Sequence, residues 1–125
     1  MNFNKITENH QKVIKLTNNI EISNNLPFVF IAGPCQIESL EHSIMICDFL
    51  ANLCSKLSIS YIFKSSFDKA NRTSIGSKRG IGIEESIKVF ETIKKQFNCP
   101  ILTDIHNEEQ CKIFGNIVDI LQMIR

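Results

Sequence analysis

The sequence FVFIAGPCQIES, residues 28 to 39, decides the fold class. Its first five residues are apolar, Gly33-Pro34 interrupts the run, and Ser39 precedes a long amphipathic segment. A short apolar run that stops at Gly-Pro is typical of a strand buried on both faces. Ser39 is a good helix N-cap, because its hydroxyl can accept a hydrogen bond from a backbone N–H of the first turn. The stretch therefore predicts a buried strand, a tight connection and a helix.

The same order of elements repeats along the chain. From Leu40 to about Leu57 the apolar positions recur at three and four residues and predict a helix. Further strands are expected at residues 60–63, 101–105 and 117–121, and further helices at residues 84–97 and 107–114. Strands that alternate with helices indicate a parallel sheet with right-handed crossovers, hence an α/β fold.

The chain reads as one domain, because no repeat, low-complexity tract or linker divides its 125 residues. Residues 12–16 and 20–22 flank Thr17-Asn18-Asn19 and predict an N-terminal β-hairpin within residues 1–26. A net charge of +1 gives no global field toward nucleic acid or an anionic membrane, so neither is expected as a partner. The sequence has no apolar leader and no run long enough for a membrane span, so we expect a cytoplasmic protein.

The five cysteines do not predict a disulfide framework. They form no C-x-x-C pair, and their number is odd: Cys35, Cys47, Cys54, Cys99 and Cys111. Cys47 and Cys54 share one face of the predicted helix with apolar residues. We therefore expect both to be small buried thiols.

Four polar residues mark the carboxyl ends of the predicted parallel strands: Cys35, Lys64, Asp104 and Gln122. In parallel α/β folds this edge is where ligands bind, because the strand ends and the loops that follow them converge there. One such residue would carry little weight, but four in corresponding positions predict a site.

The stretch KSSFDKANRTS, residues 64–74, suits an anionic ligand. Lys64, Lys69 and Arg72 supply three cations, and Asn71 and Thr73 supply neutral hydrogen-bonding groups. The alternative is a solvated polar loop, as charge-rich loops usually are, here over residues 66–82. A Gly-x-Gly at residues 80–82 lacks the third glycine of a dinucleotide fingerprint, and no P-loop motif occurs.

Cys35, Asp104 and His106 leave two interpretations open. Mixtures of Cys, Asp and His bind divalent metals such as Zn or Fe, but no closed ligand set is visible, and ordinary turn residues fit as well. Asp104 would orient a substrate hydroxyl, pair with a cation of the loop, or transfer a proton.

Three motifs resemble the 3-deoxy-D-manno-octulosonate 8-phosphate synthases, also called 2-dehydro-3-deoxyphosphooctonate aldolases. They are AGPCQIES at 32–39, FKSSFDKANRTS at 63–74 and TDIH at 103–106, and the resemblance runs from about Pro27 to Gln122. The related 3-deoxy-D-arabino-heptulosonate 7-phosphate synthases carry K-P-R-T/S where this chain has KANRT at 69–73. The resemblance therefore favours the octulosonate enzymes, with the heptulosonate enzymes as the lesser alternative.

The resemblance implies a (β/α)8 TIM barrel. Residues 27–122 would be its first four β/α units, and since a barrel takes about 250 residues, the chain would be the N-terminal half of one. Residues 123–125 depart from the family pattern, which suggests a truncation or frameshift near residue 123. The alternative function is then a non-catalytic barrel remnant that at most binds sugar phosphates or a partner half-barrel.

The resemblance also implies an activity: phosphoenolpyruvate, D-arabinose 5-phosphate and water give 3-deoxy-D-manno-octulosonate 8-phosphate and phosphate, for lipopolysaccharide biosynthesis. Lys64 and Lys69 would face phosphoenolpyruvate, and Asn71, Arg72 and Thr73 would hold arabinose 5-phosphate. Asp104 would contact the reacting end of the sugar, and Gln122 would line the pocket, with Lys69 and Asp104 as the catalytic pair. Cys35 is typical of the metal-dependent members, so a divalent ion (Zn, Fe or Mn) and a homotetramer are expected.

Overall fold

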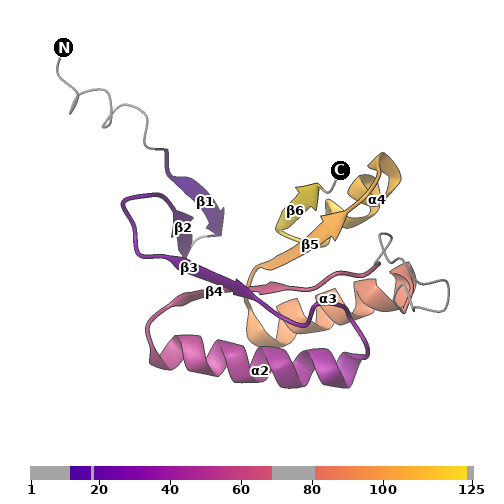
Figure 1. The fold of residues 1–125 in the computed structure, drawn as a ribbon, viewed down its shortest axis with the longest axis horizontal. Helices are drawn as coiled ribbons and strands as arrows, with labels where there is room; N and C mark the ends of the chain where they lie inside the picture. Colours follow the sequence, from indigo (N-terminus) through magenta and orange to yellow (C-terminus); the bar gives the residue numbers. More distant parts are fainter. Residues whose placement is uncertain (1–11, 18, 69–80, 124–125) are drawn as a thin grey trace, which may run out of the picture.

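The computed structural model describes residues 12–17, 19–68 and 81–123. Its elements, in chain order, are β1 (Ile14–Thr17), β2 (Ile20–Ile22), β3 (Val29–Ala32), α2 (Leu40–Lys56), β4 (Ser60–Lys64), α3 (Ile83–Phe97), β5 (Ile101–Ile105), α4 (Glu108–Phe114) and β6 (Ile120–Met123). β1 and β2 form an antiparallel hairpin, and the other strands form a parallel sheet in the order β3-β4-β5-β6 (Figure 1). The predicted α/β class, hairpin and parallel sheet are confirmed, and this arrangement is consistent with part of a TIM barrel.

The core lies between the sheet and the helices α2 and α3, which run side by side beneath it (Figure 1). The middle of β4 and all of β5 are buried, and Phe63 and Ile101 belong to one apolar cluster with Phe90 and Ile93 of α3. Cys47 of α2 is also fully buried, and Cys54 is nearly so, which confirms the expected buried thiols.

Local signals set the helix boundaries as the sequence predicted. The Ser39 hydroxyl accepts a hydrogen bond from the His42 backbone N–H at 3.1 Å, so α2 begins at Leu40. The Asn107 side chain does the same for Gln110 at 2.9 Å at the start of α4. Asn98 adopts the left-handed conformation, with a φ of 52°, and ends α3.

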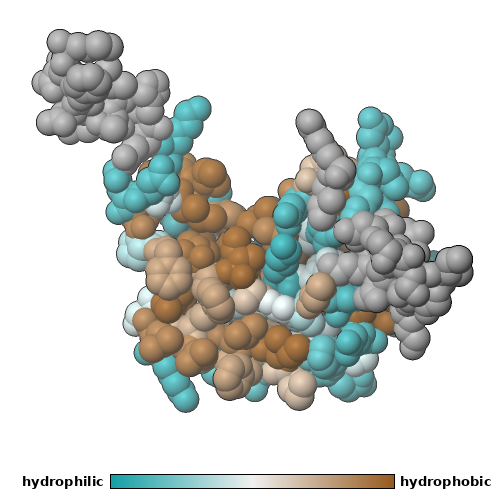
Figure 2. All heavy atoms as spheres, in the orientation of Figure 1, coloured by the Kyte–Doolittle hydropathy of each residue, from teal (hydrophilic) through white to brown (hydrophobic). Residues whose placement is uncertain are grey.

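The prediction that the first strand of the alternation is buried on both faces is wrong. In β3, Phe30 is 39% exposed and Ile31 is 42% exposed. The reason is its position: β3 is an edge strand of the described sheet, and the described helices cover one face of that sheet only. Figure 2 shows apolar residues gathered on the surface over β3 and α2.

The last strand begins later than predicted. It was expected at residues 117–121, but β6 is Ile120–Met123. Ile117 and Val118 donate their backbone N–H groups to the Phe114 carbonyl at 3.0 Å, so they continue the turn after α4. Val118 is buried in the core, and its apolar character reflects that packing instead of strand pairing.

The hairpin lies at the amino ends of the parallel strands. Residues of β1 and β2 line hollows together with Ser60 at the start of β4 and Pro100 just before β5. The opposite edge, where the strands end, carries a pocket lined by Cys35, Lys64 and Asp104, among others. Among the described helices, none combines the length and the apolar character needed to cross a membrane.

Candidate functional site

A pocket of about 280 Å³ lies at the carboxyl ends of β3, β4 and β5. It is lined by Ile31, Ala32, Gly33, Pro34, Cys35, Lys64, Ser66 and Asp104. Three of the four residues that the sequence placed at this edge therefore come together: the Cys35 thiol, the Lys64 ammonium and the Asp104 carboxylate. A cation, a carboxylate and a thiol in one concave site can bind an anionic ligand and orient its polar groups.

Gly33 lets the loop after β3 approach the end of β4. A Cβ atom at this position would lie 1.9 Å from the Lys64 carbonyl oxygen, so no other residue fits without a shift of the backbone. Beyond Gly33 the segments that follow β3 and β4 stay paired, because Ser66 donates its N–H to the Cys35 carbonyl at 3.3 Å. This close approach is what places Cys35 beside Lys64.

The strand register places Lys64, Asp104 and Gln122 on the same face of the sheet. Lys64 pairs with Leu102, which is two residues before Asp104, and Asp104 pairs with Gln122. Lys64 is half-buried and Asp104 is buried. Gln122 is exposed and lies next to Asp104 in β6, but it does not line the pocket.

Asp104 is the buried centre of the site. It is 3% exposed, its Oδ1 accepts a hydrogen bond from the Ser66 hydroxyl, and its Oδ2 lies 3.4 Å from His106 Nε2. A buried carboxylate is costly unless polar neighbours compensate it: the Ser66 hydroxyl supplies a hydrogen bond to one oxygen, and the His106 ring lies close to the other. Asp104 is therefore held in one orientation at the pocket wall.

The start of the segment after β4 is buried, which does not fit the alternative of a solvated loop from residue 66 onward. Ser66 and Phe67 are 2% and 1% exposed, and Ser65 is fully buried. Ser65 donates to the Pro34 carbonyl at 2.8 Å, and Thr103 donates to the Ser65 carbonyl at 2.8 Å. These bonds tie three loop and strand ends together, which explains why hydroxyl residues follow Lys64.

The other predicted substrate residues lie outside the described residues. These are Lys69, Asn71, Arg72 and Thr73. Ser66, by contrast, lines the pocket and was missed as a site residue, although it stands in the quoted motif. The sequence signal for Ser66 was the pair of serines directly after a strand. Successive side chains of an extended segment point to opposite sides, so one of the two hydroxyls faces the site.

The described residues do not form a metal site by themselves. Within residues 12–17, 19–68 and 81–123, no three His, Cys, Asp or Glu side chains lie close enough to hold an ion. The Cys35 thiol is exposed at the pocket and could supply one ligand. His106 makes its contacts to Asp104 and to the Asp68 carbonyl.

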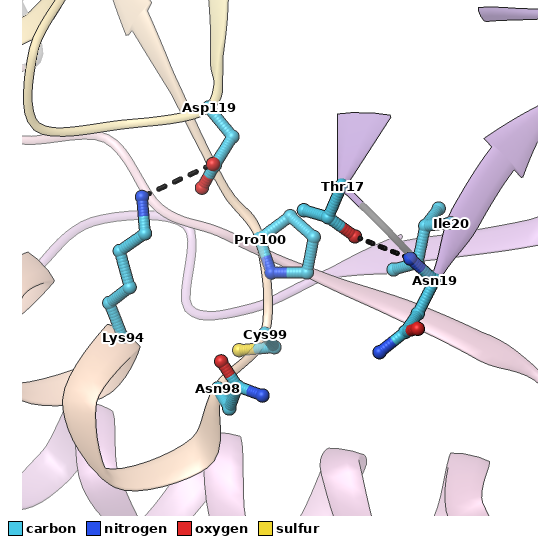
Figure 3. Close-up of a pocket in the computed structure, with 8 residues that line it drawn as sticks. All are labelled: Thr17, Asn19, Ile20, Lys94, Asn98, Cys99, Pro100 and Asp119. Carbon is cyan, nitrogen blue, oxygen red and sulfur yellow. Dashed lines mark hydrogen bonds and ion pairs between the residues drawn. The ribbon is translucent and has the colours of Figure 1, made fainter. Parts of the chain in front are cut away.

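A second hollow, of about 210 Å³, lies at the opposite end of the sheet, between the hairpin and the end of α3 (Figure 3). Its charged groups are Lys94 and Asp119, which pair with each other at 3.1 Å. Since each neutralises the other, this hollow offers a substrate anion no excess charge. It is the weaker candidate of the two.

The buried thiols are also weak candidates for chemistry. The Sγ atoms of Cys47 and Cys99 lie 4.0 Å apart. This hydrogen bond, together with burial, holds the pKa of Cys47 far above its ordinary value. Burial likewise raises the pKa of Cys54. Cys47 and Cys54 therefore keep their protons near neutral pH, and neither lines the pocket, whereas the exposed Cys35 does.

Comparison with known proteins agrees with the geometry. A family model for the DAHP synthetase I family matches residues 6–123. The chain is 55% identical, over 113 residues, to 2-dehydro-3-deoxyphosphooctonate aldolase of Rickettsia felis, and 56% identical to that of Rickettsia typhi. In each case the alignment covers 90% of this chain and 41% of the relative, so the chain spans less than half the length of these relatives. The resemblance to the octulosonate enzymes is confirmed, and the chain belongs to the DAHP synthetase I family.

Proposed function

We propose that the protein condenses phosphoenolpyruvate with D-arabinose 5-phosphate. Water enters, 3-deoxy-D-manno-octulosonate 8-phosphate forms and inorganic phosphate leaves, as a step toward lipopolysaccharide. The observation that carries this proposal is the convergence of Cys35, Lys64, Ser66 and Asp104 on one pocket at the carboxyl ends of the strands. That pocket occurs in a chain that is 55% identical to proteins named for this product.

The described residues suggest how the two substrates are held. The Lys64 ammonium offsets the negative charge of phosphoenolpyruvate, and the Asp104 carboxylate accepts a hydrogen bond from a hydroxyl at the reacting end of the sugar. Much of the rate would come from holding two mutually repelling anions with the enol carbon facing the aldehyde. By resemblance to the family, we assign Lys69 to phosphoenolpyruvate, and we assign Asn71, Arg72 and Thr73 to the sugar phosphate. Gln122 would lie at the rim of the pocket.

Cys35 is proposed as one ligand of a divalent metal ion, Zn, Fe or Mn. The remaining ligands would come from outside the described residues, since these hold no group of three. Replacing Cys35 by serine should abolish the bound metal measured by mass spectrometry of the purified protein. Replacing the half-buried Cys111, which does not line the pocket, is the matched control and should leave the metal content unchanged. Retained metal in the Cys35→Ser protein would contradict this assignment.

Three further parts of the proposal concern the setting of the reaction. We propose that the protein is cytoplasmic, that each subunit contains a complete (β/α)8 barrel, and that four identical subunits assemble. Its partners would be small anionic molecules and neither nucleic acid nor a membrane. The apolar surface over β3 supports barrel closure, because β3 is an edge strand of the sheet within the described residues, and an edge strand with exposed apolar side chains favours further pairing (Figure 2). Size-exclusion chromatography with light scattering tests the tetramer.

The test of the activity uses the complete protein as its source makes it, captured with an antibody to the N-terminal segment and measured for intact mass. Phosphate release that requires both phosphoenolpyruvate and arabinose 5-phosphate is the expected result. Phosphate release with a four-carbon aldose phosphate would favour the heptulosonate enzyme. If neither sugar phosphate gives phosphate release, the non-catalytic remnant is favoured.

Variants sharpen this test. Lys64→Met should lower kcat/KM for phosphoenolpyruvate by about 10- to 100-fold, because a charge-assisted contact is lost. Lys56→Met, in the exposed last turn of α2, is the matched control and should leave kcat/KM unchanged. Equal effects of the two variants would contradict the role of Lys64.

A further inference from the structure

The imidazole of His106 joins two parts of the site that are far apart in the sequence. His106 follows β5 directly, and its Nε2 lies 3.4 Å from Asp104 Oδ2 and 3.1 Å from the backbone carbonyl oxygen of Asp68. Its side chain is only 17% exposed. Asp68 follows the buried segment after β4 and immediately precedes Lys69. The ring therefore bridges the ends of two neighbouring strands.

The contact to Asp68 fixes the tautomer of the ring. A carbonyl oxygen can only accept a hydrogen bond, so Nε2 must carry a hydrogen at this distance. The same nitrogen lies 3.4 Å from Asp104 Oδ2, which is also an acceptor. A neutral His106 protonated at Nδ1 would place a bare nitrogen against two oxygen atoms, and both contacts would become repulsive.

The backbone around the ring is fixed as well. The His106 N–H donates to the Gln110 side-chain oxygen at 2.8 Å, and the Gln110 N–H donates to the Asn107 side chain at 2.9 Å. Gln110 is 9% exposed, so this bond is shielded from competing water. The first turn of α4 therefore determines where the imidazole of His106 can lie.

Asp104 is consequently contacted at both of its carboxylate oxygens. The Ser66 hydroxyl donates to Oδ1, and the His106 ring faces Oδ2. A carboxylate with both oxygens packed against fixed groups has little freedom to rotate about its Cβ–Cγ bond. Its remaining lone pairs point in fixed directions, which is what a group that orients a substrate hydroxyl needs.

We infer that His106 is a positioning residue, which, as the Nε2–H tautomer, fixes the Asp104 carboxylate and the backbone of Asp68 relative to each other. The expected effect on the alignment of the sugar rests on the proposed function. The contacts of His106 with Asp104 and Asp68 do not depend on that function. His106 does not exchange a proton with substrate in this assignment.

The first test compares two variants of the complete protein in the condensation assay. His106→Ala should lower kcat by about 100-fold, the scale of a small misplacement of a reacting group. His106→Gln, whose side-chain amide can donate near the position of Nε2, should restore kcat to within about tenfold of the wild-type value. His42→Gln is the matched control: His42 lies on α2 beside Glu38 and outside the pocket, so kcat should not change.

The second test does not depend on activity. Long-range 1H–15N NMR of the ¹⁵N-histidine-labelled wild-type protein reports which ring nitrogen is protonated. A His106 ring with its hydrogen on Nε2 is the expected result. A neutral ring protonated at Nδ1 would overturn the inference, whatever the kinetics of the variants.

The outcomes separate this inference from the proposed function. If the wild-type protein fails to condense the substrates, the proposed function fails, and the NMR result alone decides the role of His106. If the wild-type protein is active, a His106→Ala protein with wild-type kcat overturns the inference. A His106→Gln protein as impaired as His106→Ala overturns it too, because a donor at that position would then not suffice.

Discussion

Replacing Asp119 by alanine should destabilise the sheet much more than replacing Lys94, with which it forms the ion pair drawn in Figure 3. Asp119 immediately precedes β6, and its Oδ2 accepts a hydrogen bond from the Ile101 backbone N–H at 2.9 Å. Its own N–H donates to the Ile101 carbonyl at 2.9 Å, and its Oδ1 lies 3.1 Å from Lys94 Nζ. The carboxylate thus joins the start of β5 to the start of β6.

The magnitudes decide which contact matters. A hydrogen bond to a charged group in a partly buried position contributes about 1.5–3 kcal/mol, because the Ile101 N–H is left unpaired when the carboxylate is removed. The Lys94 side chain is 45% exposed, so the ion pair contributes less than about 1 kcal/mol. We expect losses of about 2–3 kcal/mol for Asp119→Ala, about 1 for Asp119→Asn, whose amide oxygen still accepts, and under 1 for Lys94→Ala.

Urea denaturation of the complete protein, followed by circular dichroism, measures the free energy of unfolding of each variant. The contact also bears on the site, because the β6 register is what pairs Gln122 with Asp104. A Lys94→Ala protein as unstable as Asp119→Ala would refute the reasoning. So would an Asp119→Ala protein as stable as the wild type.

Three more predictions follow from buried groups. The Ser43 hydroxyl is fully buried with no hydrogen-bond partner among the described residues, so Ser43→Ala should raise the free energy of unfolding by up to about 1 kcal/mol; a clear loss in urea would contradict this. Gly33→Ala places a Cβ atom 1.9 Å from the Lys64 carbonyl oxygen and should cost at least about 3 kcal/mol, seen as a lowered Tm, and a wild-type Tm would show that the loop can move away. The contact with Cys99 and burial raise the pKa of Cys47 above its ordinary 9.0, so the folded state keeps a proton that the unfolded thiol loses. The stability that the Cys47 thiol contributes is therefore fully present below about pH 9 and declines above it by up to about 1.4 kcal/mol per pH unit, so plots of unfolding free energy against pH over that range should be flatter for Cys47→Ala.

Several features of the fold and site follow from residues close together in the sequence. The start of α2 depends on Ser39 and His42, and the start of α4 depends on Asn107 and Gln110, three residues apart in each case. Such caps act within one helical turn, so the sequence predicts them well. The order of strands and helices could also be predicted, because each element has its own local pattern of apolar residues. That order determines the edge where Cys35, Lys64 and Asp104 gather.

The sequence by itself thus determined the alternation, the helix ends and the edge that carries the pocket. Only the tertiary structure decided that β3 is half exposed, that β6 begins at Ile120, and that Ser66 holds Asp104. Burial of a strand depends on what covers it, and a hydrogen bond between residues 38 positions apart depends on how two strands are paired. Local propensity carries no information about either, because pairing partners and covering helices are chosen by the packing of the whole chain.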